Sequence, residues 1–243
     1  MTEQAGTSRK VLIVASNPAV STVTGWPVGF WWAELTHPYL AFQEAGYAIT
    51  VASPEGGELQ GDGYSDPEDP SGYSTHDFVS LGFKHSPTFS ALVKFTPAIS
   101  DLKVADFDAI LVIGGQGPMI TIIDDLAVHK LVADFYEAGK ITALICHGTC
   151  VLLKARLSNG ELLCKGKTWT GFADSEEAYA DSFTGQRVQP FWIGESARAI
   201  ADTNYVAGPQ FAPFAVRDGL LITGQQQNSG RAAAELMIAA LGK

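Results

Sequence analysis

Cys146, His147 and Gly148 stand together at the end of a largely apolar run, residues 141–145, and residues that suit a helix follow them. A nucleophile at such a strand-to-helix corner projects over the edge of a sheet, and the next helix directs backbone N–H groups toward it. We expect this environment to favour the thiolate of Cys146, with His147 as a proton acceptor or a positive charge beside it. Gly148 lets the backbone pass close to the same group. The predicted chemistry is nucleophilic attack by a cysteine.

The alternative for Cys146 is a buried core thiol, which is how most isolated cysteines behave. We interpret the other two cysteines, Cys150 and Cys164, as core residues. The three are too few and too clustered for a disulfide framework, and they match no tight zinc spacing. We therefore expect reduced thiols and no metal site.

A second apolar run, residues 108–113, ends in Gly-Gly-Gln-Gly at residues 114–117. Glycine amides are not obstructed by side chains, so they can point at the same sheet edge as the cysteine. We predict an oxyanion hole whose two donors are the amides of Gly115 and His147.

Glu34 lies in a markedly apolar stretch, with Trp31, Trp32 and Leu35 around it. A carboxyl group in such surroundings has a raised pKa and can hold or pass a proton near neutral pH. The alternatives are a solvated helix residue or an i, i+3 partner of His37.

The elements that must position these groups are short apolar runs that alternate with helical patterns. The runs are typical of parallel strands buried on both faces, at residues 10–16, 47–53, 108–115 and 141–146. A helix is expected over residues 30–46, with Pro38 kinking it or splitting off its first turn, and another over residues 124–140.

The last third predicts a hairpin over residues 214–224 that turns at Asp218 and Gly219, followed by a helix from about Ser229 to Leu241. We infer a three-layer α/β/α sandwich with a mostly parallel central sheet, flavodoxin-like, and a nucleophile elbow at Cys146. Two long loops, residues 17–29 and 54–77, are expected to be irregular and to form pocket walls or a lid. The alternative for the second loop is a disordered insertion.

The length, composition and charge of the chain exclude some classes of partner. The chain has 243 residues, 46% of them hydrophobic, which favours a single domain over residues 1–243 with a flexible N-terminus at residues 1–9. A net charge of −10 disfavours nucleic acid as a partner. No apolar run is long enough to span a bilayer, and the N-terminal segment lacks the apolar core of a secretory signal. We expect a soluble, cytoplasmic protein with no membrane partner.

Five motifs in order resemble the DJ-1/PfpI superfamily, and most closely its Hsp31-like, glyoxalase III-like branch. In this sequence they read AxxCHG at the cysteine, GGxG upstream, E-x-x-H-P in the first helix, KGKTWTGFADSEE downstream and DGLLITGQQQNS near the end. The resemblance extends from Val11 to Leu241. It implies the same fold as the patterns above.

The resemblance also assigns roles. It implies that Cys146 is the nucleophile, His147 its partner and Glu34 the carboxyl group that handles protons beside the sulfur. The acid that orients His147 falls on Glu177, with Glu176 and Asp174 as competitors.

One position and one short segment depart from the family pattern. Several glyoxalase-type members have histidine where this chain has Gln116, which can hydrogen-bond a substrate oxygen but cannot titrate. The ending QQQNS likewise differs from the QNPAS type. These departures do not affect the expected fold, but because of them the resemblance does not identify the exact substrate.

The implied function is that of a cofactor-independent cysteine enzyme for small reactive carbonyls, for example the conversion of methylglyoxal to lactate. One alternative is an isonitrile hydratase or amidohydrolase that uses the same cysteine. Another is a stress-responsive chaperone or redox sensor with an exposed, low-pKa thiol, in which Trp26, Phe30, Trp31 and Trp32 form a binding surface rather than core or pocket lining. A homodimer is also expected, because many relatives pair.

Overall fold

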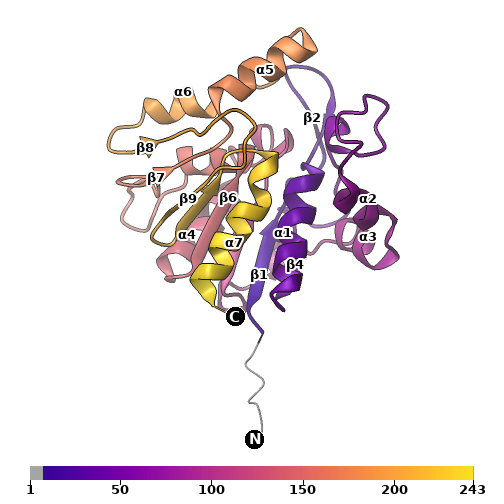
Figure 1. The fold of residues 1–243 in the computed structure, drawn as a ribbon. Helices are drawn as coiled ribbons and strands as arrows, with labels where there is room; N and C mark the ends of the chain where they lie inside the picture. The colour runs from indigo at the N-terminus through magenta and orange to yellow at the C-terminus, as the bar shows by residue number, and fades with distance from the viewer. Residues whose placement is uncertain (1–7, 243) are drawn as a thin grey trace, which may run out of the picture.

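The computed structural model describes residues 8–242, and its centre is a six-stranded sheet in the order β4-β1-β5-β6-β10-β9 (Figure 1). All neighbouring strands are parallel except β9, which pairs antiparallel with β10 at the edge. The strands are β1 (Lys10–Val14), β4 (Ala48–Ala52), β5 (Ala109–Val112), β6 (Ile141–Ile145), β9 (Ala215–Asp218) and β10 (Leu221–Gly224). The predicted mostly parallel α/β fold is confirmed.

The register of the central strands places the functional loops at one edge. Val14 of β1 lies opposite Val112 of β5, and Val112 lies opposite Leu144 of β6. Every residue of β5 and β6 is buried, which explains why both strands are almost wholly apolar. Because the three strands end together, the segments that follow β1, β5 and β6 leave the sheet side by side.

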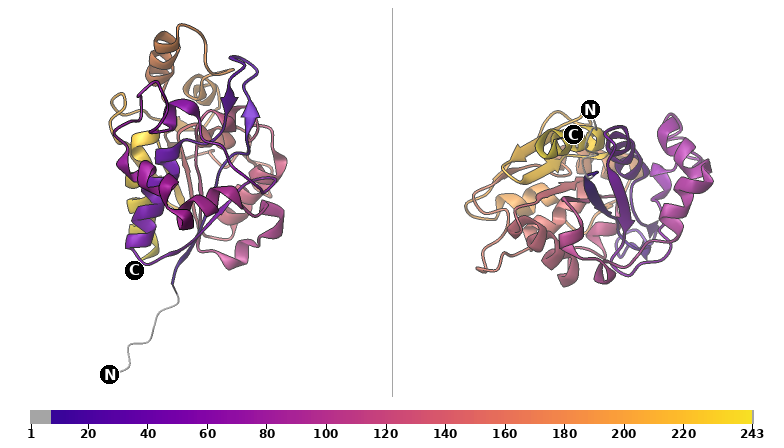
Figure 2. Two further views of the ribbon diagram at one scale, coloured as in Figure 1. Left: turned by 90° about the vertical axis from the view of Figure 1, so that its right-hand side faces the viewer. Right: turned by 90° about the horizontal axis from the view of Figure 1, so that it is seen from below.

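Helices cover both faces of the sheet (Figures 1 and 2). On one face α1 packs against α7 and α2, and on the other α4 packs against β5 and β6. A Cβ added at Gly230, the first residue of α7, would lie 3.1 Å from the Pro38 ring on α1, so the two helices approach closely there. The helices are α1 (Trp32–Glu44), α2 (Phe78–His85), α3 (Pro87–Lys94), α4 (Leu126–Glu137), α5 (Asp174–Thr184), α6 (Ile193–Arg198) and α7 (Gly230–Leu241).

Several local expectations need correction. Helix α1 runs through Pro38 as one helix, so the expected separation of its first turn is not observed. The loop at residues 17–29 contains a small hairpin, β2 (Ala19–Val20) with β3 (Pro27–Val28). The helix expected after the apolar run is a 3₁₀ helix, Cys146–Leu153, which begins at the cysteine itself. Helices α2, α3, α5 and α6 were not predicted.

The remaining short elements lie near the edge strand β9. Strand β7 (Thr168–Trp169) contacts β9 and pairs in parallel with β8 (Asn204–Tyr205). The expected turn of the hairpin is present, with Gly219 in the left-handed region at φ 65°. The pairing of β7 with β8 holds the segment that precedes α5.

The expectation of a flexible N-terminus at residues 1–9 falls mainly on residues 1–7, which lie outside the described residues. Ser8 donates a hydrogen bond of 2.6 Å to the Gly46 carbonyl, and Arg9 pairs with Asp108 at 3.3 Å. Within residues 8–242, no helix combines the length and apolar character that a bilayer crossing requires.

Candidate active site

Cys146 sits at a strained corner directly after β6. Its φ is 54°, in the left-handed region that non-glycine residues rarely occupy, and its side chain is 2% exposed. A Cβ at Gly148 would lie 2.8 Å from the carbonyl oxygens of Val112 and Ile113, so only glycine lets the 3₁₀ helix pack against the end of β5. The corner therefore holds the thiol at the edge of the sheet between two strand ends.

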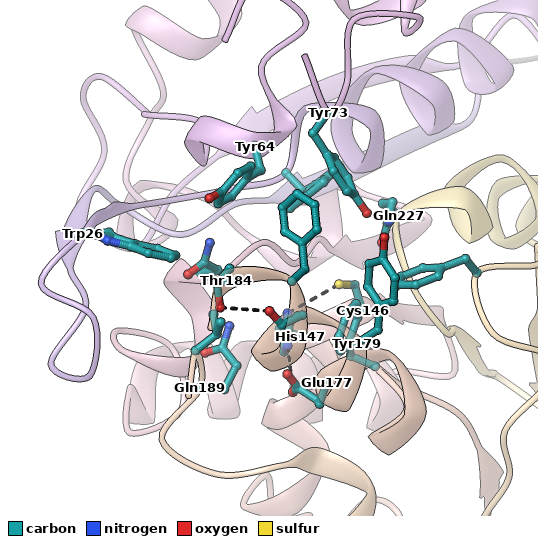
Figure 3. A pocket seen from close by; sticks show the side chains of 17 residues that line it. Trp26, Tyr64, Tyr73, Cys146, His147, Glu177, Tyr179, Thr184, Gln189 and Gln227 are labelled. Carbon is teal, nitrogen blue, oxygen red and sulfur yellow. Dashed lines mark hydrogen bonds and ion pairs between the residues drawn. The ribbon is translucent and has the colours of Figure 1, made fainter. Parts of the chain in front are cut away.

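His147 links Cys146 to Glu177 on α5 (Figure 3). The Sγ atom of Cys146 lies 3.6 Å from Nδ1 of His147, and Nε2 of His147 lies 3.1 Å from Oε1 of Glu177. An ionised carboxylate only accepts hydrogen bonds, so Nε2–H donates to Glu177. The imidazole also stacks on Phe172 with ring centroids 4.3 Å apart, which fixes its plane. The three side chains have the geometry of a cysteine triad.

The structure distinguishes the three acids that compete for His147. Glu177 alone of the three contacts the imidazole. Glu176 is used elsewhere, accepting hydrogen bonds from the Phe211 amide and the Gln225 side chain, both at 2.8 Å. Asp174 pairs with Arg198 near the surface.

Glu34 is completely buried beside the thiol. Its Oε2 accepts a hydrogen bond of 2.7 Å from the amide of Gly114. A Cβ at Gly114 would lie 2.8 Å from that oxygen and 2.8 Å from Cβ of Cys146, which shows how closely the two side chains converge. Among the described residues, Oε1 of Glu34 has no hydrogen-bond partner. The alternative pairing with His37 is absent, because His37 contacts Asp77 at 2.9 Å.

Burial sets the protonation of Glu34. It raises the pKa of this carboxyl group to about 7, although the Cys146 thiol, the Gly114 amide and the charge of His147 act in the opposite direction. Near neutral pH the group is present in both protonation states. This agrees with the expectation from its apolar neighbours.

The expectation of a depressed pKa for Cys146 is wrong. Burial raises the pKa of the thiol well above its usual value, and the charge and hydrogen bonding of Glu34 raise it further. The amides of Gly115 and His147 act on the sulfur in the opposite sense but are weaker. Sequence reasoning weighed the backbone amides but not the effect of burial and of the Glu34 charge on the thiol pKa. The exposed, low-pKa thiol assumed for a redox sensor is therefore not present.

The pKa of His147 is also raised, which favours its charged form. Burial lowers the pKa of its imidazole, but the charge and hydrogen bond of Glu177, with smaller contributions from Glu34 and Asp62, raise it above its usual value overall. The imidazolium form is thus favoured next to the sulfur, where it stabilises a thiolate that forms during reaction.

The strand end at residues 114–117 supplies backbone donors. Gly115 has φ 98°, and a Cβ there would lie 2.5 Å from the Gly29 carbonyl oxygen and 2.6 Å from the Trp31 nitrogen, so no other residue fits. The amides of Gly115 and His147 both act on the Cys146 sulfur. The two donors predicted for an oxyanion hole thus converge on the thiol.

Asp62 is a site residue that sequence reasoning missed. Its fully buried carboxylate accepts hydrogen bonds from the amides of Gly29, at 2.8 Å, and Gln116, at 2.5 Å. Burial raises its pKa to about 7, against the effect of those two amides and of His147. The loop at residues 54–77 is therefore no disordered insertion, because it ties the glycine loop in place. Asp62 is one of several acids in that loop, and nothing in the sequence distinguishes it.

A cavity of about 70 Å³ opens over Cys146, His147 and Glu177 (Figure 3). Gln116 lines it, whereas Glu34 and Gly115 are not among its lining residues. Trp26 and Trp31 line it too, while Phe30 and Trp32 are buried in the core. The cavity is largely aromatic, and the thiol at its base is the reactive group that a bound molecule meets. Among residues 8–242, no group of three or more His, Cys, Asp or Glu side chains is placed to hold a metal ion.

The sequence profile of the DJ-1/PfpI family matches residues 28–239, which is most of the chain. The chain belongs to the DJ-1/PfpI family. Within this family, the chain is similar to glyoxalases over most of its length. The chain is 26% identical over 241 residues to the probable glutathione-independent glyoxalase hsp3103 of Schizosaccharomyces pombe, covering 89% of this chain and 92% of the relative.

Solved structures of similar proteins share the whole architecture. The crystal structure of glyoxalase III from Candida albicans superposes with a TM-score of 0.78 at 26% identity, covering 96% of this chain and 97% of that one. The Rapid Encystment Protein 24 kDa of Francisella tularensis superposes with a TM-score of 0.85 at 26% identity, covering 97% and 100%. The match to glyoxalase III agrees with the resemblance found in the motifs.

Proposed function

We propose that this protein is a cofactor-independent cysteine enzyme of the glyoxalase III type, which converts a 2-oxoaldehyde and water into a 2-hydroxy acid. The observation that carries the proposal is the pair formed by Cys146 and the buried carboxyl group of Glu34. Transfer of hydrogen between adjacent carbons needs a nucleophile and, beside it, a group that takes up and releases a proton. Glu34, with a pKa of about 7, is such a group next to Cys146. The glyoxalases similar to this chain support the same reaction.

The first step is addition of the thiol to the aldehyde. Sγ of Cys146 bonds to the aldehyde carbon while the imidazolium of His147 gives its Nδ1 proton to the carbonyl oxygen and takes up the thiol proton in return. The amides of Gly115 and His147 hold the charge that develops on that oxygen. The product is a hemithioacetal, and Glu177 keeps the imidazole in the orientation that this transfer requires.

The second step moves hydrogen within the substrate. Ionised Glu34 removes the hydrogen from the former aldehyde carbon, and the resulting enediol receives it back on the neighbouring carbon. The first carbon is oxidised and the second reduced, so no external oxidant takes part. Water then cleaves the thioester and releases the hydroxy acid and the free thiol. On this proposal the enzyme is classed as a lyase.

The test is turnover of methylglyoxal by pure, reduced protein in the presence of a chelator and without glutathione. We expect stoichiometric formation of lactate and loss of activity in Cys146→Ser, because a hydroxyl is a much weaker nucleophile at neutral pH. Absence of lactate with folded protein would overturn the proposal.

The alternative is attack by Cys146 on an isonitrile or amide carbon, as in a hydratase or amidohydrolase. It is favoured by two unpartnered amide atoms among the lining residues, Oε1 of Gln116 and Nε2 of Gln189, which could hydrogen-bond such a substrate. A comparison of kcat/KM for aldehydes, isonitriles and amides decides between the two, and a strong preference for aldehydes excludes the alternative.

We further propose a single-domain, cytoplasmic protein that forms a homodimer. The family match from residue 28 to residue 239 supports one domain, and symmetric dimers are the commonest oligomers. Sedimentation at micromolar concentration tests the dimer, which is ruled out if only the 25.9 kDa chain mass is found.

A further inference from the structure

The wall of the cavity over Cys146 consists mainly of aromatic rings, which come from distant parts of the sequence (Figure 3). They lie in the loop before α1, in the loop at residues 54–77, on or next to α5, and near β9. These rings belong to Trp26, Trp31, Tyr64, Tyr73, Phe172, Tyr179, Phe183 and Phe211. A substrate whose substituent is only a methyl group would contact few of them.

Three of the rings form a cluster where the loop at residues 54–77 meets α5. The ring centroid of Tyr64 lies 6.1 Å from that of Tyr73 and 5.9 Å from that of Phe183, and Tyr73 lies 5.9 Å from Phe183. All three pairs are edge-to-face, the arrangement that aromatic side chains prefer. Phe183 remains 54% exposed and Tyr73 38% exposed. Large apolar rings left exposed around a reactive thiol indicate a surface for an apolar ligand.

The polar groups of the cavity restrict the ligand further. Among the described residues that line it there is no Lys or Arg, and its only charged side chains, His147 and Glu177, pair with each other. A carboxylate or phosphate on the substrate would therefore be desolvated without a counter-charge. The amide groups of Gln116 and Gln189 each carry an unpartnered atom. The unpartnered Nε2 of Gln189 is a donor and fits a neutral oxygen, such as the ketone of an oxoaldehyde, whereas the unpartnered Oε1 of Gln116 only accepts.

Resting on the proposed function, we propose that the cavity selects 2-oxoaldehydes whose substituent is a neutral aromatic ring, the arylglyoxal class. The ring packs against Tyr64, Tyr73 and Phe183, while the aldehyde carbon reaches Cys146. The reaction balances as before, since an arylglyoxal and water give an aryl hydroxy acid by internal transfer of hydrogen. Methylglyoxal is then a poorer substrate, because its methyl group leaves most of the aromatic wall without contact.

The experiment compares kcat/KM for phenylglyoxal and methylglyoxal in the full-length protein and in two variants. We expect phenylglyoxal to exceed methylglyoxal by about tenfold or more, the scale on which apolar pockets discriminate. In Phe183→Leu the ratio of the two should fall at least about threefold, chiefly through KM for phenylglyoxal. The matched control is Phe95→Leu, which removes a ring that is 78% exposed and outside the cavity, and should leave the ratio unchanged.

A carboxyl group in the para position of phenylglyoxal provides an independent probe. It should lower kcat/KM relative to phenylglyoxal by about tenfold, since no cation in the described lining offsets its charge. Equal or better turnover of methylglyoxal, with a ratio that Phe183→Leu does not change, would overturn this inference and leave the proposed function standing. Failure of both oxoaldehydes to react would overturn the proposed function and the inference with it.

Discussion

The imidazole of His147 lies between a thiol and a carboxylate, with Nε2 3.1 Å from Oε1 of Glu177. Both side chains are almost completely buried, at 6% and 1% exposure. Water therefore does not compete for the hydrogen bond, and Glu177 controls both the orientation of the ring and its affinity for a proton.

Glu177→Gln should separate these two effects from folding. The amide keeps the shape of the side chain but removes the charge that raises the pKa of His147, so the imidazolium should lose its proton at lower pH. We expect kcat/KM to fall by about a hundredfold, and the basic limb of its pH profile to move to lower pH. The control is Asp174→Asn on the same helix, which does not contact His147. An unchanged basic limb would contradict the role given to Glu177.

Glu34→Gln should abolish the transfer of hydrogen. The amide retains the shape and the acceptor for the Gly114 amide but cannot titrate. Turnover should fall by about a hundred- to ten-thousand-fold, the usual contribution of general acid–base catalysis. In the wild-type protein the acidic limb of kcat/KM should lie near pH 7, where Glu34 of the free enzyme ionises. If Glu34→Gln retains near-normal turnover while Cys146→Ser is inactive, the nucleophile stands and the proton-transfer role is wrong.

Glu34 also predicts how stability depends on pH. Its pKa in the folded protein, about 7, exceeds the ordinary value of 4.5. The folded state therefore binds this proton more tightly than the unfolded state, and the stability this contributes is complete below pH 4.5 and is lost as pH rises through 7. The loss has a slope of at most about 1.4 kcal/mol per pH unit. Urea unfolding at several pH values should show wild type losing stability relative to Glu34→Gln over this range. A constant difference between the two proteins would contradict the raised pKa.

The reactivity of Cys146 should change in the opposite direction to catalysis in the same variant. The charge and hydrogen bonding of Glu34 help raise the pKa of the thiol, so their removal lowers it and increases the thiolate fraction. Alkylation of Cys146 by iodoacetamide at pH 7 should be faster in Glu34→Gln than in wild type by about threefold or more. Cys150→Ala in both backgrounds excludes alkylation of the neighbouring buried thiol. Slower alkylation in Glu34→Gln would show that Glu34 stabilises the thiolate.

The sheet could be predicted because each buried strand is marked by its own residues. The runs that contain β1, β4, β5 and β6 are apolar on both faces, and this pattern needs no information from the rest of the chain. The glycine at the turn of the β9–β10 hairpin is equally local. By contrast, α2 and α3 have eight residues each and α6 has six, which is shorter than the stretch over which a helical period can be recognised.

The site could be predicted only where a residue acts through its immediate neighbours. Cys146 and His147 are adjacent in sequence, and the apolar residues beside Glu34 in the sequence indicate the burial that raises its pKa. The pKa of Cys146 was predicted in the wrong direction, because it depends first on the burial of the thiol and then on the charge and hydrogen bonding of Glu34, which the fold brings from α1. Asp62 was missed for the same reason, since its partners Gly29 and Gln116 lie on other segments.

Asp62→Asn tests whether this buried carboxylate positions the oxyanion hole. Asp62 accepts hydrogen bonds from the amides of Gly29 and Gln116, one on each carboxylate oxygen. An asparagine has only one acceptor oxygen, so its NH₂ group would face the other amide donor. The glycine loop should shift, and kcat/KM should fall by about tenfold or more, toward the loss seen when an oxyanion donor is removed. Stability should fall by about 1–3 kcal/mol, the usual cost of an unsatisfied buried group.

If Asp62 had a purely structural role, Asp62→Asn would lower the stability of the protein without changing the pH at which His147 titrates. Asp62 contributes to the raised pKa of His147, so its neutralisation should also move the basic limb of the kcat/KM profile to lower pH. Asp66→Asn, in the same loop but paired with Lys84 at 2.5 Å, serves as the control that should leave the limb in place. If Asp62→Asn is less stable yet keeps the wild-type pH profile and kcat, the carboxylate braces the loop and has no part in positioning the amides around Cys146.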